Sequence, residues 1–197
     1  PRAKRGERPD WSPRERPARP AHGRAPEWAE RRPRRDDADR IAEILAAGWQ
    51  QSYSHFMPAP FLLPRIDPAR RKLEIAEWLD DDFNPAGEAI FVAEDGGDIL
   101  GFIHMELGDK GELGATGIVN LLYVDPPAQQ RGIGRRLLAT GVRWHQERAP
   151  GPLVLSAFVN NPSRFAYDAL GGVEAKRVVS QVHDAPIESA LYLWADP

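Results

Sequence analysis

The residues best suited to chemistry lie in a short loop with two glycines, residues 129–135, which reads Gln-Gln-Arg-Gly-Ile-Gly-Arg. Glycines spaced one residue apart let the backbone turn tightly and expose its N–H groups. A helix is predicted directly after the loop. The first N–H groups of a helix have no internal partner and its dipole is positive there, so such a junction attracts anions. We therefore expect a phosphate-bearing ligand on residues 130–135.

Two elements must position this loop. Before it, Leu121-Leu122-Tyr123-Val124 predicts a short buried strand, and Asp125-Pro126-Pro127 ends it because proline cannot donate to a sheet ladder. After it, apolar and small residues recur with helical spacing at Ile133, Leu137, Leu138, Gly141, Val142 and His145. The sequence thus predicts a strand, a glycine loop and an amphipathic helix in succession.

The rest of the chain alternates between strands and helices. Further strands are predicted at residues 30–35, 89–94, 99–107, 153–159, 176–182 and 189–194. Asp95-Gly96-Gly97-Asp98 predicts a hairpin turn between the second and third of these. The expected fold class is α+β, with a mixed, mostly antiparallel sheet of six or seven strands flanked by about four helices.

Three further helices are predicted, each with an apolar inward face. The first begins at Asp36 or Asp37, whose side chain is expected to cap it. The second spans about residues 68–79, and its inward residues are expected to be Leu73, Ala76 and Leu79. The third follows Asn160-Asn161-Pro162-Ser163, and its inward residues are expected to be Phe165, Ala169 and Leu170.

Composition narrows the classes of chemistry. The 197 residues include no cysteine, which excludes disulfides, cysteine-ligated zinc and a cysteine nucleophile. No apolar run approaches the ~20 residues that a membrane span needs, and the N-terminus shows no apolar signal segment. We expect no membrane partner, no metal and a cytoplasmic location.

Charge is distributed unevenly along the chain. Residues 1–35 contain 11 Arg and 1 Lys against 5 acidic residues, whereas the remainder has 14 basic and 24 acidic residues. Residues 1–28, rich in Pro and Arg, are predicted to be a disordered basic tail ahead of a domain at residues 29–197. The tail lacks interleaved aromatic residues, so nucleic-acid binding is the less favoured interpretation. The acidic body either steers a cationic amine or is ordinary solubilising surface.

These motifs resemble the GNAT superfamily of acetyl-CoA-dependent N-acetyltransferases. Residues 129–134 resemble that family's pyrophosphate loop, and Val124-Asp125-Pro126 before it also matches. A second motif of that family is similar to the pattern formed here by Asn160, Tyr167 and Leu170-Gly171. The resemblance covers about residues 30–195. A dinucleotide-dependent oxidoreductase is disfavoured because the GxGxxG spacing is missing.

The resemblance implies a sheet in which two parallel strands splay apart to receive the pantetheine arm of acetyl-CoA. The unpaired backbone groups at the splay need partners, and the arm supplies them. On this resemblance, cofactor contacts are expected from Leu122, Tyr123, Val124, Gln129, Gln130, Arg131, Gly132, Ile133, Gly134, Arg135, Asn160, Ser163 and Tyr167. Arg131 is favoured for a charge-assisted contact with the diphosphate, and the role of Arg135 is left open.

The family's chemistry is direct attack of a neutral amine on the thioester in a ternary complex. Tyr167 stands where the family places the acid that protonates the leaving thiolate, and a tyrosine packed as core is the alternative. A backbone N–H near Leu122 is the expected oxyanion donor. Asn120 stands where many relatives carry an acid, and an amide cannot take up a proton, so Asn120 would position a water or bind the acceptor. Glu106, or His104 beside it, is the substitute base, unless the proton passes to bulk water.

The acceptor amine is the least defined part of this hypothesis. The resemblance places its pocket near the first two helices, where Trp49, Tyr53, His55 and Phe56 either line it or are plain core aromatics. The leading hypothesis is acetylation of a small-molecule or peptide amine. The alternative, which Asn120 motivates, is a catalytically silent acyl-CoA-binding module. A homodimer is left open.

Overall fold

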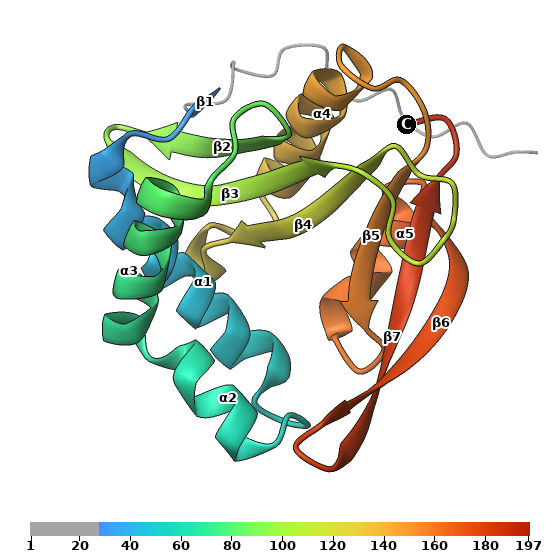
Figure 1. Ribbon diagram of the computed structural model, residues 1–197. Helices are drawn as coiled ribbons and strands as arrows, with labels where there is room; N and C mark the ends of the chain where they lie inside the picture. Colours follow the sequence, from blue (N-terminus) through green and yellow to red (C-terminus); the bar gives the residue numbers. More distant parts are fainter. Residues whose placement is uncertain (1–27) are drawn as a thin grey trace, which may run out of the picture.

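The computed structural model describes residues 28–197, which form one seven-stranded mixed sheet with helices on both faces (Figure 1). The strands lie side by side in the order β1-β2-β3-β4-β5-β7-β6. Their bounds are β1 Ala29–Arg31, β2 Glu88–Asp95, β3 Asp98–Leu107, β4 Gly117–Val124, β5 Leu153–Phe158, β6 Val173–Val182 and β7 Ala185–Trp194. The predicted α+β class is confirmed.

Five α-helices flank the sheet in the described part of the chain. Their bounds are α1 Ala38–Tyr53, α2 Ala59–Ile66, α3 Pro68–Glu77, α4 Ile133–Gln146 and α5 Phe165–Ala169. Successive strand residues point to opposite faces, so Phe102 of β3 packs with α1 whereas Ile103 packs with α4. The sheet therefore separates an α1–α3 face from an α4 face.

The hairpin between β2 and β3 forms as its turn residues predict. Gly96 and Gly97 have φ angles of +59° and +98°, a left-handed conformation that side chains disfavour. β2 and β3 pair antiparallel along their whole length, from Glu88 opposite Glu106 to Asp95 opposite Asp98. This hairpin carries Glu106 and His104 to the centre of the sheet, next to β4.

The predicted inward faces of two helices are partly wrong. In α3, Leu73 is 73% exposed and Ala76 is also exposed, while Ile75 is buried. In the helix near the C-terminus, Phe165 is 63% exposed and Ala169 is exposed, so of the three predicted residues only Leu170, just beyond the helix, packs on the core. Both helices are short, with 10 and 5 residues, so helical periodicity offers too few turns to fix the phase.

The start of α1 also differs from the prediction. Asp37 stands at the N-cap position but makes no side-chain cap bond to the helix. Its carboxylate instead accepts hydrogen bonds from the Arg34 N–H, at 2.5 Å, and from the Arg31 guanidinium, at 2.5 and 3.0 Å. The bond from Arg31 is the main reason that the pKa of Asp37 is lowered. Asp37 thus ties α1 to β1 rather than capping the helix.

The predicted disordered tail, residues 1–28, lies outside the described residues except for Trp28. That side chain is 5% exposed and packs in the core on the α4 side of the sheet. The Arg136 guanidinium of α4 stacks over its ring at 4.2 Å and pairs with Glu30. The packed domain therefore includes Trp28.

Candidate active site

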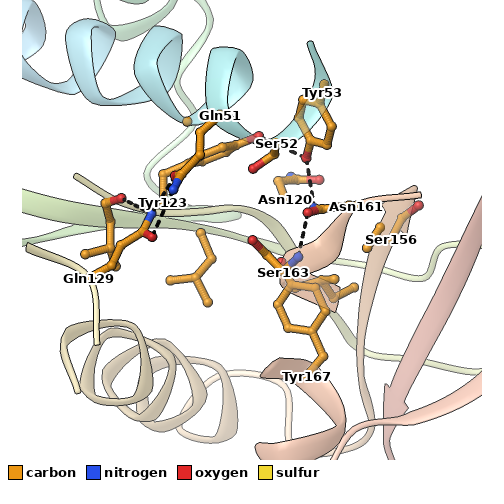
Figure 2. Close-up of a pocket in the computed structure, with 15 residues that line it drawn as sticks. Gln51, Ser52, Tyr53, Asn120, Tyr123, Gln129, Ser156, Asn161, Ser163 and Tyr167 are labelled. Atoms are coloured by element: carbon orange, nitrogen blue, oxygen red, sulfur yellow. Dashed lines mark hydrogen bonds between the residues drawn. The ribbon is translucent and has the colours of Figure 1, made fainter. Parts of the chain in front are cut away.

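The site is organised by the parallel pair β4 and β5, which is joined for only three residues. Gly117, Ile118 and Val119 pair with Leu153, Val154 and Leu155, and no pairing between these strands follows. Residues 120–124 of β4 therefore turn an unpaired backbone edge toward β5. A hollow of ≈ 90 Å³ opens there, with Asn120, Tyr123, Asn161 and Tyr167 among its lining residues (Figure 2).

A bulge in β4 lies at the point where the strands part. Along β3, His104 pairs with Leu121 and Met105 pairs with Val119, so Asn120 is an extra residue between the two rungs. Such an extra residue disrupts the ladder locally and re-aims nearby side chains. The Asn120 amide here donates to the Glu106 carboxylate at 2.6 Å, on the α1–α3 face of the sheet.

The loop from Gln129 to α4 presents a run of free backbone donors. The N–H groups of residues 130–135 donate to no group within residues 28–197. Gln130 and Gly132 have φ angles of +63° and +82°, a left-handed conformation that turns the chain just before α4. A cavity of ≈ 510 Å³ lies against the loop and is also lined by Leu122, Ser163 and Tyr167. The junction has the donors and the dipole that an anion requires, with an apolar channel beside it.

Tyr167 lies where this cavity meets the hollow between the strands, since it lines both. Its ring packs against Tyr192, with centroids 5.5 Å apart, and its hydroxyl makes no hydrogen bond within residues 28–197. Burial, followed by the proximity of Tyr53 and Tyr192, raises the pKa of Tyr167. The hydroxyl is therefore protonated at physiological pH and is available as a donor to a ligand.

Known proteins are similar to this chain in sequence and fold. The acetyltransferase (GNAT) family model matches residues 47–171, which is more than half of the chain. The chain belongs to the GNAT acetyltransferase family. The match begins within α1 and ends just after α5, so it contains the β4 bulge, the glycine loop and Tyr167.

Two curated GNAT relatives differ in how much of them is covered. Mycothiol acetyltransferase of Rhodococcus erythropolis is 35% identical over 95 residues, which are 45% of this chain but only 31% of that protein. The uncharacterized N-acetyltransferase YuaI of Bacillus subtilis is 24% identical over 135 residues, 68% of this chain and 73% of that protein. The chain thus spans about a third of the mycothiol acetyltransferases.

Solved GNAT structures agree with the fold. The PaiA N-acetyltransferase from Thermoplasma acidophilum, in complex with coenzyme A, superposes with a TM-score of 0.58 at 15% identity, covering 83% of this chain and 97% of that one. The ribosomal-protein-alanine N-acetyltransferase from Brucella melitensis gives 0.62 at 17% identity, covering 85% and 99%. At these identities the likeness supports the fold alone.

The GNAT glycine loop carries two arginines with different surroundings. Arg131 lies 3.6 Å from Asp95 of the β2–β3 hairpin, and its side chain is 45% exposed. Arg135 is exposed, lines the cavity beside the loop and forms no ion pair within residues 28–197. The sequence favoured Arg131 for the contact with the diphosphate. In the structure, Arg135 is the arginine of this pair that has no ion-pair partner within residues 28–197.

The candidate base residues lie together on the α1–α3 face. Glu106 is half-buried and accepts from Asn120, while His104 is buried and its Nε2 lies 2.9 Å from Glu88 Oε2. Burial lowers the pKa of His104, although Glu88 and Glu106 oppose that shift. His104 is therefore neutral near pH 7, and its Nε2 is already paired with Glu88. Of the two candidates, Glu106 is the one that contacts Asn120 at the bulge.

The aromatic candidates divide between packing and polar contacts. Trp49, Phe56 and Tyr53 cluster with Phe158 at centroid distances of 5.4 to 6.4 Å. Tyr53 is also tied to the site, because the Asn161 amide donates to its hydroxyl at 3.3 Å. His55 is exposed, and its Nε2 lies 3.2 Å from the Asn160 carbonyl. Tyr53 is the member of this group that lines the hollow between β4 and β5.

Sequence reasoning missed Asn161 and residues of α1. The Asn161 side chain is buried and accepts from the Ser163 N–H at 2.9 Å while donating to Tyr53, which links α5 to α1 (Figure 2). Asn160 is instead exposed. An asparagine directly before proline is a signal for a helix start, and it would have favoured Asn161. Gln51, which exchanges a 2.9 Å amide bond with Gln129, carried no such signal.

Two further findings concern the described residues as a whole. No group of three or more His, Asp or Glu side chains within residues 28–197 is arranged to hold a metal ion. No helix in this part of the chain is long and apolar enough to cross a membrane.

Proposed function

We propose that the protein transfers the acetyl group of acetyl-CoA to a primary amine by direct attack in a ternary complex. The observation that carries this proposal is the continuity of two features: the unpaired β4 edge at residues 120–124 and the six free N–H groups at residues 130–135. An extended arm that ends in a diphosphate matches both. Membership of the GNAT family supports the same ligand.

The residues of the cofactor side can each be assigned to a part of acetyl-CoA. The diphosphate would lie on the N–H groups of residues 130–135, where the α4 dipole adds to their effect. The pantetheine arm would pair with the backbone of residues 122–124, and Leu122 and Val124 offer it an apolar wall. Gln129 now donates to the Val124 carbonyl at 3.1 Å, so its side chain would release that acceptor when the arm binds.

The reaction needs a donor for the oxyanion and another for the sulfur. The amine nitrogen attacks the thioester carbon, and a backbone N–H near Leu122, at the β4 bulge, would stabilise the negative oxygen. As the C–S bond breaks, the Tyr167 hydroxyl would donate to the leaving thiolate. Because the pKa of Tyr167 is raised, this group enters the reaction as a donor and not as a base. The amine proton would pass to Glu106, directly or through a water.

The alternative is a catalytically silent acyl-CoA-binding module. Asn120 favours it, since a carboxylate at that position would be the simplest base. Both functions use the same acetyl-CoA site, and they differ only in whether the acetyl group is transferred. For the chain as a whole, we propose an acetyltransferase domain at residues 28–197, which includes the packed Trp28, preceded by a basic tail.

Two measurements test the proposal in sequence. Calorimetric titration of the full chain with acetyl-CoA is expected to show saturable binding, and no binding at millimolar cofactor would contradict the cofactor seat. A thiol-release assay across amino acids, alkyl amines, aromatic amines and peptide N-termini is then expected to show turnover with at least one class. Binding without turnover in any class would favour the silent module.

A further inference from the structure

We propose that the acceptor is an amine that also bears a carboxylate, as an amino acid does, and that Arg65 binds this carboxylate. This inference deepens the proposed acetyl transfer and depends on it for the position of the amine. It concerns a second hollow, of ≈ 380 Å³, on the face of β4 that turns toward α1 and α3. Its walls include Trp49, Trp78, Arg65, Arg71, His104 and Leu121.

Arg65 is a half-buried cation without a carboxylate partner. Its Nη1 donates to the Phe61 carbonyl at 2.8 Å, and its guanidinium stacks over the Phe61 ring at 3.5 Å and near the Trp49 ring at 5.3 Å. No Asp or Glu oxygen within residues 28–197 lies within 4 Å of it. A buried charge is costly unless it is paired, so this guanidinium is suited to an anion from a ligand.

The surroundings of Arg65 reinforce the need for an anion. Arg71 approaches from α3, since its Nε donates to the Arg65 carbonyl at 3.0 Å. The one carboxylate in the walls of the hollow, Glu74, is already shared by Arg70 and Arg71 at 2.8 and 2.7 Å. Burial first, and then Arg71, lower the pKa of Arg65, although the guanidinium keeps its charge at neutral pH. The charged side chains that line this end of the hollow are thus two cations, Arg65 and Arg71, and one anion, Glu74.

The wall that β3 and β4 contribute to the hollow lies near a carboxylate, Glu106. His104 and Leu121 pair across β3 and β4 and both line it. From there toward the point where β4 and β5 part, the next polar side chains are Glu106 and Asn120, which bond to each other. Two residues along a strand cover about 7 Å, so the Glu106 carboxylate lies about one rung from the hollow. An amine would be drawn toward Glu106 and the thioester, and a carboxylate toward Arg65. A zwitterion matches both ends.

The experiment uses matched acceptors and matched variants of the full chain. Each amino acid in the thiol-release assay is paired with its carboxamide, which keeps the amine and removes the negative charge. Arg65→Gln is compared with Arg70→Gln, which removes the same charge from an arginine that is exposed and pairs only with Glu74. Thermal unfolding of each variant shows whether the fold is retained, and Arg65→Lys tests whether charge alone suffices.

We expect the wild type to prefer the acids. In Arg65→Gln, KM for the acids should rise about ten- to a hundredfold, the range for a lost hydrogen bond to a charged group, with KM for acetyl-CoA unchanged. Arg70→Gln should keep the wild-type preference. The inference is overturned if carboxamides are acetylated as well as acids, or if Arg65→Gln leaves KM for the acids unaltered.

A product-binding titration separates this inference from the proposed transfer. N-acetylated amino acids and their amides are titrated while the tryptophan fluorescence is followed, because Trp49 and Trp78 line the hollow. Binding of the acid, lost in Arg65→Gln and absent for the amide, supports the anion site even if no amine is turned over. Equal binding of acid and amide, or no binding at millimolar ligand, rejects the site even if transfer is observed.

Discussion

The two faces of the sheet offer a ligand different kinds of group. On the α4 face, the cradle at residues 130–135 and the open edge at residues 120–124 are made of backbone groups from one stretch of chain. On the α1–α3 face, the hollow is made of side chains from α1, α2, α3, β3 and β4. The first face therefore depends on backbone conformation, and the second depends on side-chain identity and on the packing of distant segments.

This difference explains how one fold can keep a cosubstrate while its acceptors vary. Backbone donors are present whatever the side chains are, so the cofactor face tolerates substitution except where glycine conformation is required. On the proposed acceptor face side-chain charge would select the ligand, so we expect one substitution to change the preferred acceptor. In the proposed reaction, Tyr167 from the α4 side and Glu106 from the α1–α3 side act on the reacting atoms at the boundary between the two binding faces.

The largest expected effect tests that boundary. Tyr167→Phe removes only the hydroxyl, so kcat should fall by about 10²- to 10⁴-fold while the dissociation constant of acetyl-CoA stays within about twofold. Thiol release and calorimetry measure the two quantities. Tyr192→Phe is the matched control, because the Tyr192 hydroxyl already accepts from Arg164 at 3.1 Å and does not line the β4–β5 hollow.

The pH dependence has a definite sign for this residue. Because burial raises the pKa of Tyr167, its neutral donor form persists at and beyond pH 10, the ordinary tyrosine value. The kcat of the wild type should therefore not decline between pH 8 and pH 10 through ionisation of Tyr167. The shape of the pH profile in this range should be the same in Tyr167→Phe. A decline in that range which the variant removes would mean that Tyr167 titrates there and that its environment is not the buried one described.

A smaller effect is expected on the acceptor side of the boundary. Glu106→Gln should lower kcat about tenfold, less than the loss at Tyr167, because an amine can also release its proton to water. The KM for acetyl-CoA should not change, since Glu106 lies on the α1–α3 face. Glu147→Gln at the exposed end of α4 removes the same charge away from the site. Equal activities of the two variants would remove Glu106 from the mechanism.

The same difference between the two faces explains which features could be predicted from the sequence and which could not. The cradle follows from two glycines and a helix start, which are neighbours in the chain, so the strand, loop and helix were all predicted. Arg65 lies in α2, which was not predicted because Pro58, Pro60 and Pro64 suggest a loop. Its hollow also needs α3, whose predicted phase placed Leu73 inward although that residue is exposed.

Single polar residues were harder to place than elements. Asp37 has the position of a helix cap, but Arg31 is close enough in space to take its carboxylate. Asn161 rather than its neighbour Asn160 is buried, because its side chain closes the turn into α5 and reaches Tyr53. In both cases a contact from another element outweighs a local preference, and the spacing of residues along the chain does not predict such contacts.

The smallest expected effect tests whether the cofactor face depends on backbone conformation alone. Gly132 has a φ of +82°, and a Cβ added there would meet no atom within 4 Å, so an alanine has room but is strained. Gly132→Ala should cost about 1 kcal/mol of unfolding free energy, or should shift the loop and weaken acetyl-CoA binding several-fold. Gly134→Ala is the control, because Gly134 is helical and its Cβ would meet Val124 at an ordinary 3.6 Å. If both substitutions weaken binding equally, space and not backbone conformation limits the cradle. If Gly132→Ala alone does so, the backbone geometry of residues 130–135 is what holds the anion.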